Sequence, residues 1–158
     1  MASDANGTLS GAGLTKAATG TFTLAAGTPT TVTAGAGGVV LHAAGFDNAT
    51  VDSGAGTATI FGASGTTQNL TGTLSGSAGH PNFAVAGSGN ETLNAANSAS
   101  SNWLSANTEA TSASTILIAG SGADTLIAGS APGSVTMTGG SGSDAFALLK
   151  QAVVGCMT

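Results

Sequence analysis

A short strand-like run followed by a glycine-rich break recurs through most of the chain, and this alternation limits the folds open to it. Runs such as T-F-T-L at 21–24 and T-A-T-I at 57–60 alternate threonine with an apolar residue. Period-two alternation is typical of strands with one buried and one exposed face. The breaks, such as GAGG at 35–38 and GGSG at 139–142, are rich in glycine. Glycine adopts the backbone angles of tight turns without steric cost, so the pattern indicates many short strands joined by turns.

The β-branched and apolar runs between the breaks are predicted as strands. They are Thr21–Ala25, Thr30–Ala34, Val39–Ala43, Ala49–Asp52, Thr57–Phe61, Asn69–Leu74, Asn82–Ala86, Glu91–Ala95, Thr115–Ala119, Thr125–Ala128, Ser134–Thr138 and Ala145–Leu149. Strands at this spacing are compatible with a sandwich or a solenoid.

Composition favours the solenoid. The 158 residues suit one domain, and 41% are hydrophobic, yet only 4% are aromatic. A sandwich needs bulky interdigitating side chains between two sheets, whereas a narrow coil is filled by small ones. We therefore predict an all-β chain that forms a single parallel β-solenoid over residues 1–158, resembling a β-helix or β-roll with Gly-rich turns.

Within this single domain the sequence predicts Thr/Val/Gly coils over 11–95, further coils over 115–149 and a tail over 150–158. Residues 96–114 lack alternation and are rich in Ser and Asn, so they are predicted as an irregular loop. The loop holds Trp103, which has two interpretations. It plugs an apolar gap or coil end, or it forms a stacking platform for a sugar or another partner.

Charged residues are scarce, and the balance is acidic. The chain has two Lys, no Arg and seven acids, for a net charge of −5. Nucleic-acid binding and a polybasic membrane patch both need clustered basic residues, so neither is expected. No stretch approaches the roughly 20 apolar residues of a membrane span. The segment M-A-S-D-A-N-G-T-L-S-G-A-G lacks the basic and apolar regions of a Sec signal peptide, and Cys156 has no second cysteine to pair with.

Three segments share a nonapeptide pattern. Residues 139–147 read GGSGSDAFA, which matches G-G-x-G-x-D-x-U-x, and 119–127 read AGSGADTLI. Residues 86–94 read AGSGNETLN, with Glu91 in place of the aspartate. The C-terminal half thus resembles the RTX, or hemolysin-type, calcium-binding repeats. The resemblance implies possible Ca²⁺ binding at turns stacked on one edge, where carbonyl and carboxylate oxygens meet. The residues it implies are Gly120, Gly122, Asp124, Gly139, Gly140, Gly142 and Asp144.

Asp124 and Asp144 lie 20 positions apart, two more than two nonapeptides span. The extra residues are expected to be absorbed near Ala131–Pro132. The alternative to calcium binding is a solenoid turn that keeps the glycine pattern without the ion.

Residues 11–41 carry a second resemblance, to the passenger repeats of bacterial autotransporters, which form right-handed parallel β-helices. The positions that carry it are Leu14, Thr15, Lys16, Gly20, Phe22, Leu24, Thr31, Val32, Ala34 and Gly35. Both resemblances imply a solenoid architecture.

An enzyme is not expected. The only histidines, His42 and His80, are far apart in sequence, and no nucleophile motif frames either of them. An ice-binding surface is also not expected, because it requires a flat, regular array of threonine and the Thr-x-Thr pairs do not recur at one fixed register.

Two functions are therefore predicted. The first is an extracellular structural protein, a self-associating subunit of a fibre, biofilm matrix or surface layer, with cell-surface or matrix polysaccharide as a possible partner. The alternative is a calcium-responsive repeat segment of a larger secreted adhesin or toxin-like protein. Either is expected outside the cell or at its surface, reached by a non-Sec, type I-like route.

Overall fold

The computed structural model describes residues 7–9, 17–24, 30–43, 47–53, 56–62, 70–107, 113–130 and 133–149. These residues contain no helix, and therefore none that could cross a membrane. The strands they form are β1 (Gly7–Leu9), β2 (Ala17–Leu24), β3 (Thr30–Ala43), β4 (Asp47–Asp52), β5 (Ala58–Phe61), β6 (Leu70–Gly76), β7 (Asn82–Val85), β8 (Glu91–Ser98), β9 (Trp103–Ser105), β10 (Ser114–Ile118), β11 (Thr125–Ala128), β12 (Ser134–Thr138) and β13 (Ala145–Leu148).

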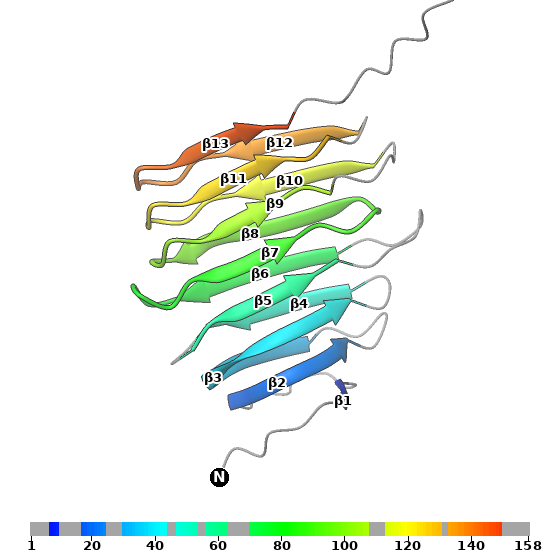
Figure 1. The fold of residues 1–158 in the computed structure, drawn as a ribbon, viewed down its shortest axis with the longest axis vertical. Coiled ribbons are helices and arrows are strands. Elements are labelled where there is room, and N and C mark those ends of the chain that lie inside the picture. The colour runs from blue at the N-terminus through cyan, green and yellow to red at the C-terminus, as the bar shows by residue number, and fades with distance from the viewer. Residues whose placement is uncertain are drawn as a thin grey trace, which may run out of the picture.

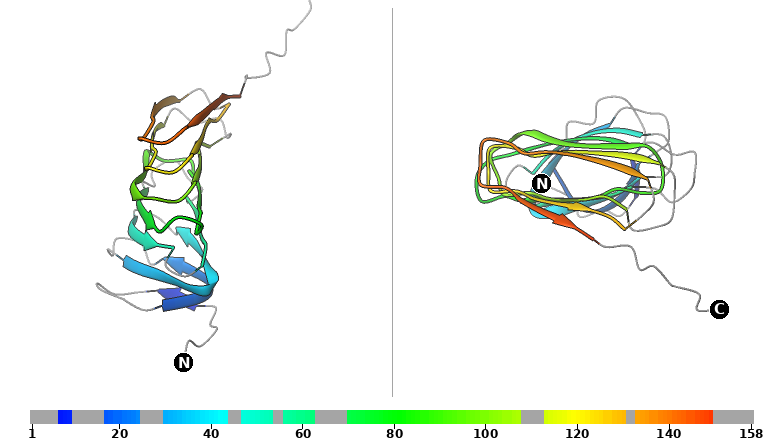
Figure 2. Two further views of the ribbon diagram at one scale, coloured as in Figure 1. Left: turned by 90° about the vertical axis from the view of Figure 1, so that its left-hand side faces the viewer. Right: turned by 90° about the horizontal axis from the view of Figure 1, so that it is seen from above.

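The strands stack as a parallel β-solenoid, which confirms the fold predicted from the sequence (Figure 1). Every pairing is parallel, and each strand between the ends of the stack pairs with strands one coil before and one coil after it. Strands β4, β6, β8, β10 and β12 form one side of the coil, which we call face 1. Strands β5, β7, β9, β11 and β13 form the opposite side, face 2. Seen along the stack, each coil is a flattened loop with these two long sides (Figure 2).

Strand β3 belongs to both faces. Its first part pairs with β4 on face 1, and its second part pairs with β5 on face 2. Between the two parts the chain turns the corner through A-G-A-G-G, where Gly38 has a φ of 78°. A residue with a Cβ is strained at such an angle, so glycine allows a single strand to continue around the edge of the coil.

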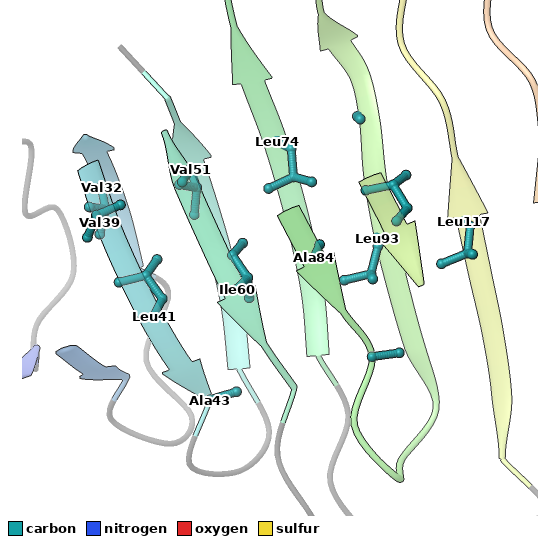
Figure 3. Close-up of a cluster of buried hydrophobic side chains, with 14 of the residues drawn as sticks. Val32, Val39, Leu41, Ala43, Val51, Ile60, Leu74, Ala84, Leu93 and Leu117 are labelled. Atoms are coloured by element: carbon teal, nitrogen blue, oxygen red, sulfur yellow. The ribbon is translucent and has the colours of Figure 1, made fainter. Parts of the chain in front are cut away.

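The interior is built from ladders of aligned apolar side chains. Leu41, Ile60, Ala84, Leu104 and Leu126 occupy one register position on face 2, and all are fully buried. Val32, Val51 and Leu74 form an equivalent ladder on face 1 (Figure 3). Each buried Leu or Val contributes roughly 1.5–3 kcal/mol relative to an exposed one, so these ladders are the main stabilising element.

The structure corrects several sequence-based boundaries. The runs predicted at 30–34 and 39–43 are parts of one strand, β3. The segment predicted as an irregular loop, 96–114, contains the end of β8 and the whole of β9. Its Ser/Asn-rich sequence lacks the alternation that marked the other strands, because β9 has only three residues and Ser105 is itself buried. Of the predicted segments, the tail over 150–158 lies outside the described residues.

Burial falls in the last described coil. Leu126 has no exposed surface, whereas Phe146, the next member of its ladder, is 51% exposed. On face 1, Val135 and Met137 of β12 pack against the buried core cluster but are only partly buried. The interior surface of the stack is therefore open at β12 and β13.

Candidate functional site: a ladder of asparagine and aspartate at one corner

Four polar side chains are stacked where the chain passes from face 1 to face 2. Asn82 is the first residue of β7, whereas Asn102, Asp124 and Asp144 immediately precede β9, β11 and β13, and the strand registers place the four in successive coils. We call this set the corner ladder. The first three members are at most 2% exposed, so this polar column lies inside the solenoid.

One hydrogen bond repeats from coil to coil along the corner ladder. The backbone N–H of Asn82 donates to Oδ1 of Asn102 at 3.3 Å, and that of Asn102 donates to Oδ1 of Asp124 at 2.5 Å. The backbone N–H of Asp124 donates to Oδ1 of Asp144 at 3.0 Å. A short side chain with an acceptor oxygen is therefore required at each step, because an unpaired backbone N–H buried here would be costly.

The two aspartates also close their own turns. Gly120 N–H donates to Oδ2 of Asp124 at 2.6 Å, and Gly140 N–H donates to Oδ2 of Asp144 at 2.6 Å. Asp124 accepts a further bond from the Asn102 side-chain amide at 2.8 Å, so both of its carboxylate oxygens have partners. This gives the G-x-x-x-D spacing a physical role. The aspartate satisfies the N–H of a residue four positions earlier and fixes the turn.

The glycines of the turns are needed because successive turns lie in direct contact. A Cβ added to Gly140 would overlap the carbonyl oxygen of Gly120, and one added to Gly142 would overlap that of Gly122. Any side chain at these positions would force the coils apart. The glycine pattern is thus explained by backbone stacking, as well as by the turn geometry itself.

The structure brings the predicted calcium-site residues together. Both turns, 119–124 and 139–144, lie at the same corner in adjacent coils, as their 20-residue spacing predicted. Ala131–Pro132, expected to absorb the extra residues, lies outside the described residues. Within the described part of the chain, no group of three or more His, Cys, Asp or Glu side chains is placed to hold a metal. An ion at this corner would depend on backbone carbonyls, and it would compete with the N–H donors that the carboxylates now accept from.

The third copy of the nonapeptide lies at the opposite corner. Glu91 begins β8, where the chain enters face 1, and is 3% exposed. Its Oε2 accepts a hydrogen bond from Gly87 N–H at 2.6 Å, whereas Oε1 has no partner. Burial raises the pKa of Glu91 from 4.5 to about 7, and the Gly87 bond acts in the opposite direction. The turn bond resembles that of Asp124, but the longer side chain leaves one oxygen buried without a partner.

Sequence reasoning missed Asn82 and Asn102, because neither lies in a nonapeptide. The signal that identifies them is their position at the start of a face 2 strand. Asn102 stands directly before β9, as Asp124 and Asp144 stand before β11 and β13, and Asn82, the first residue of β7, occupies the same register position. Since an asparagine oxygen accepts the same backbone bond as a carboxylate, the ladder continues without the acid.

Trp103 lies on a strand and not in a loop. It is the first residue of β9 and is half-buried on the outer side of face 2, beside Phe83 of β7 in register. Phe61 and His42 lie on the same side, with ring centroids 5.1 Å apart and planes inclined by 15°. Trp103 therefore does not plug a coil end. Its cover of an apolar gap and its use as a stacking platform remain the two interpretations.

One groove of about 210 Å³ lies at the corner between β2, β3 and β5, and is lined mainly by Thr19–Thr21 and Gly37–Val40. Ligand sites are typically larger, about 300–1,000 Å³, and combine an apolar lining with a few polar groups. Neither His42 nor His80 is among the residues that line this groove.

Comparison with known proteins finds no matching family model, no matching curated protein and no matching solved structure.

The corner ladder predicts a stability difference between its two aspartates. Asp124→Ala removes an acceptor from three buried donors and should lower the free energy of unfolding by about 3 kcal/mol. Asp144→Ala, at a half-buried position in the last described coil, should cost about 1 kcal/mol. Denaturant titration followed by circular dichroism measures both. Equal losses for the two variants would contradict the buried-ladder assignment.

The raised pKa of Glu91 predicts that the free energy of unfolding decreases as pH rises. The Glu91 carboxyl keeps its proton up to a pH of about 7 in the native state, whereas it loses the proton near pH 4.5 in the unfolded chain. Between these values the native state therefore binds more protons than the unfolded state. Stability should fall by about 3 kcal/mol across that window and level off above it. Glu91→Gln should remove this component from a plot of unfolding free energy against pH, and Asp52→Asn should leave it in place. A Glu91→Gln curve parallel to that of the wild type would refute the prediction.

Proposed function

We propose that the protein is a self-associating solenoid subunit of an extracellular fibre, biofilm matrix or surface layer, in which coils continue from one copy to the next. The observation that carries this proposal is the open end of the stack. Phe146 is 51% exposed, although its ladder partners Leu126 and Leu104 are fully buried. Leu148 on the same strand is 78% exposed. Covering apolar surface of this kind is the main driving force for association.

Backbone hydrogen bonding favours a second copy as the covering partner. In the described stack, β12 and β13 each pair along one edge only, and so does β1 at the other end. All existing pairings are parallel, so a copy added in the same orientation continues both faces. The edge strands S-V-T-M-T and A-F-A-L contain no charge and no proline, which are the usual features that block edge pairing.

Head-to-tail contacts of this type do not close on themselves, and they produce filaments instead of defined oligomers. The low charge of the chain adds little repulsion between copies. The resemblance of its turns to RTX repeats supports a location outside the cell or at its surface, reached by a non-Sec route. Matrix or cell-surface polysaccharide is a partner compatible with the exposed rings of face 2.

The fibre proposal predicts the effect of charge at the open end. Phe146→Arg places a cation in the apolar contact and should abolish filaments seen by negative-stain electron microscopy. Ala145→Arg places the same charge one residue away, on the outer side of the strand, and should leave filaments intact. Because both positions are exposed, neither variant should unfold the subunit, which circular dichroism checks.

Wild-type protein that stays monomeric in light scattering, with and without calcium, would overturn the proposal. Filaments that form equally in both variants would overturn the end-to-end geometry.

A second candidate function, a calcium-responsive repeat segment of a larger secreted adhesin or toxin-like protein, is favoured by one observation. The Gly120–Asp124 and Gly140–Asp144 turns are stacked directly on each other, with two carboxylates at one corner. Calcium binding there would offset the repulsion between the two acids and stabilise the last coils by linkage.

Isothermal titration with CaCl₂ tests this candidate. Wild-type protein should bind calcium, EGTA should reverse the binding, and Asp124→Asn with Asp144→Asn should lose it. Asparagine keeps the Oδ1 acceptor of the corner ladder but loses the Oδ2 acceptor of the Gly120 and Gly140 N–H groups, so circular dichroism must show that the double variant is folded. Asp52→Asn is the matched control. Absence of a calcium-dependent heat, or an unchanged heat in the double variant, excludes this function.

A further inference from the structure

The outer side of face 1 carries two columns of threonine in strict register. Strand pairing aligns Thr71, Thr92, Ile116 and Thr136 in the first column. It aligns Thr31, Thr50, Thr73, Asn94, Ile118 and Thr138 in the second. On β6, β8, β10 and β12, where both columns are present, their members stand two residues apart, as in Thr71-Gly72-Thr73. The Thr-x-Thr pairs of β6 and β12 share this register, whereas the pair of β3, Thr31 and Thr33, is offset from it by two residues. Single threonine positions are therefore aligned, although the Thr-x-Thr pairs do not all recur at one register.

Sequence spacing concealed this alignment. Partners in the second column lie 19, 23, 21, 24 and 20 residues apart, because the corner segments differ in length. A search for one fixed period fails on such a chain, whereas hydrogen bonding between coils restores the alignment in space. Seven of the ten aligned positions are threonine.

The array has a defined repeat in two directions. Neighbouring strands lie about 4.7–4.9 Å apart, and alternate residues along a strand lie about 6.5–6.8 Å apart. Each threonine presents a hydroxyl that both donates and accepts, together with a methyl group. Its β-branched side chain has few rotamers, which restricts the positions that the hydroxyl can take. The spacings of this grid are comparable with the repeat of oxygen positions on a prism face of hexagonal ice.

We propose that the outer side of face 1 binds ice, by holding first-layer water molecules in an ordered array. Ordered water bound to fixed hydroxyls is nearly as favourable as direct hydrogen bonding, and its entropic cost is small when the partners are already rigid. The backbone beneath the columns is fixed by parallel hydrogen bonds on both sides of each inner strand. None of the ten positions is charged, so no strongly hydrated group disturbs the layer.

Other occupants fit the columns less well. A protein partner would need apolar anchors, yet Ile116 is the only large hydrophobic in the array that is prominently exposed. The aromatic rings that suit a sugar lie on the opposite side, on β5, β7 and β9. Exposed and half-exposed threonines cover most of face 1, which favours water as the ligand.

The isoleucine pair of β10 permits a gain-of-function test. Ile116→Thr with Ile118→Thr completes both columns across β10, keeps β-branched side chains and should increase thermal hysteresis at equal protein concentration. Thr71→Lys, in the middle of the array, should abolish thermal hysteresis and the inhibition of ice recrystallisation. Thr59→Lys, on the outer side of face 2, is the matched control and should retain wild-type activity.

Circular dichroism at 4 °C confirms that each variant is folded, and size-exclusion chromatography fixes its association state. Wild-type protein with no thermal hysteresis and no effect on recrystallisation would overturn the proposal. So would equal losses in Thr71→Lys and Thr59→Lys, because the effect would then not belong to face 1. The assay does not depend on filament formation, so its outcome is independent of the end-to-end contact.

Discussion

Parallel hydrogen bonding between successive coils is the constraint on which the whole structure depends. It forces each residue to lie above the residue that occupies the same place in the previous coil. One apolar position therefore becomes a buried column, one threonine position an exposed column, and one Asn/Asp position the corner ladder. Short strands form extended surfaces because backbone pairing aligns the side chains at equivalent positions of successive coils.

The same constraint explains which parts of the fold were predictable. Alternation of threonine with apolar residues correctly located β12, and the glycine-rich breaks correctly indicated a solenoid. The alternation pattern did not reveal β9, because three residues are too few to show a period and because Ser105 of this strand is buried. It also split β3, because glycines that usually mark a turn here carry a strand around a corner.

The corner ladder shows a similar limit. The nonapeptide correctly aligned Asp124 with Asp144, since their spacing is close to one coil. It could not reveal Asn82 and Asn102, because the role at this position is to accept a backbone hydrogen bond, and an amide oxygen serves as well as a carboxylate. It also gave no sign that Glu91 turns at the opposite corner, with one oxygen buried and unpaired. The sequence motif locates the turn, but the contacts between coils determine which hydrogen bonds its side chain forms.

The side chains along this corner change from neutral to acidic towards the C-terminal end of the stack. Val39, Ala58, Asn82 and Asn102 occupy this register position in the earlier coils and are neutral, whereas Asp124 and Asp144 are acidic. At this corner, acidic side chains are thus confined to the last two described coils. Two copies meeting by their C-terminal coils would bring these acids together, while a head-to-tail approach sets them against a neutral corner. In the assembly that we propose, this change from amide to carboxylate would favour the head-to-tail polarity.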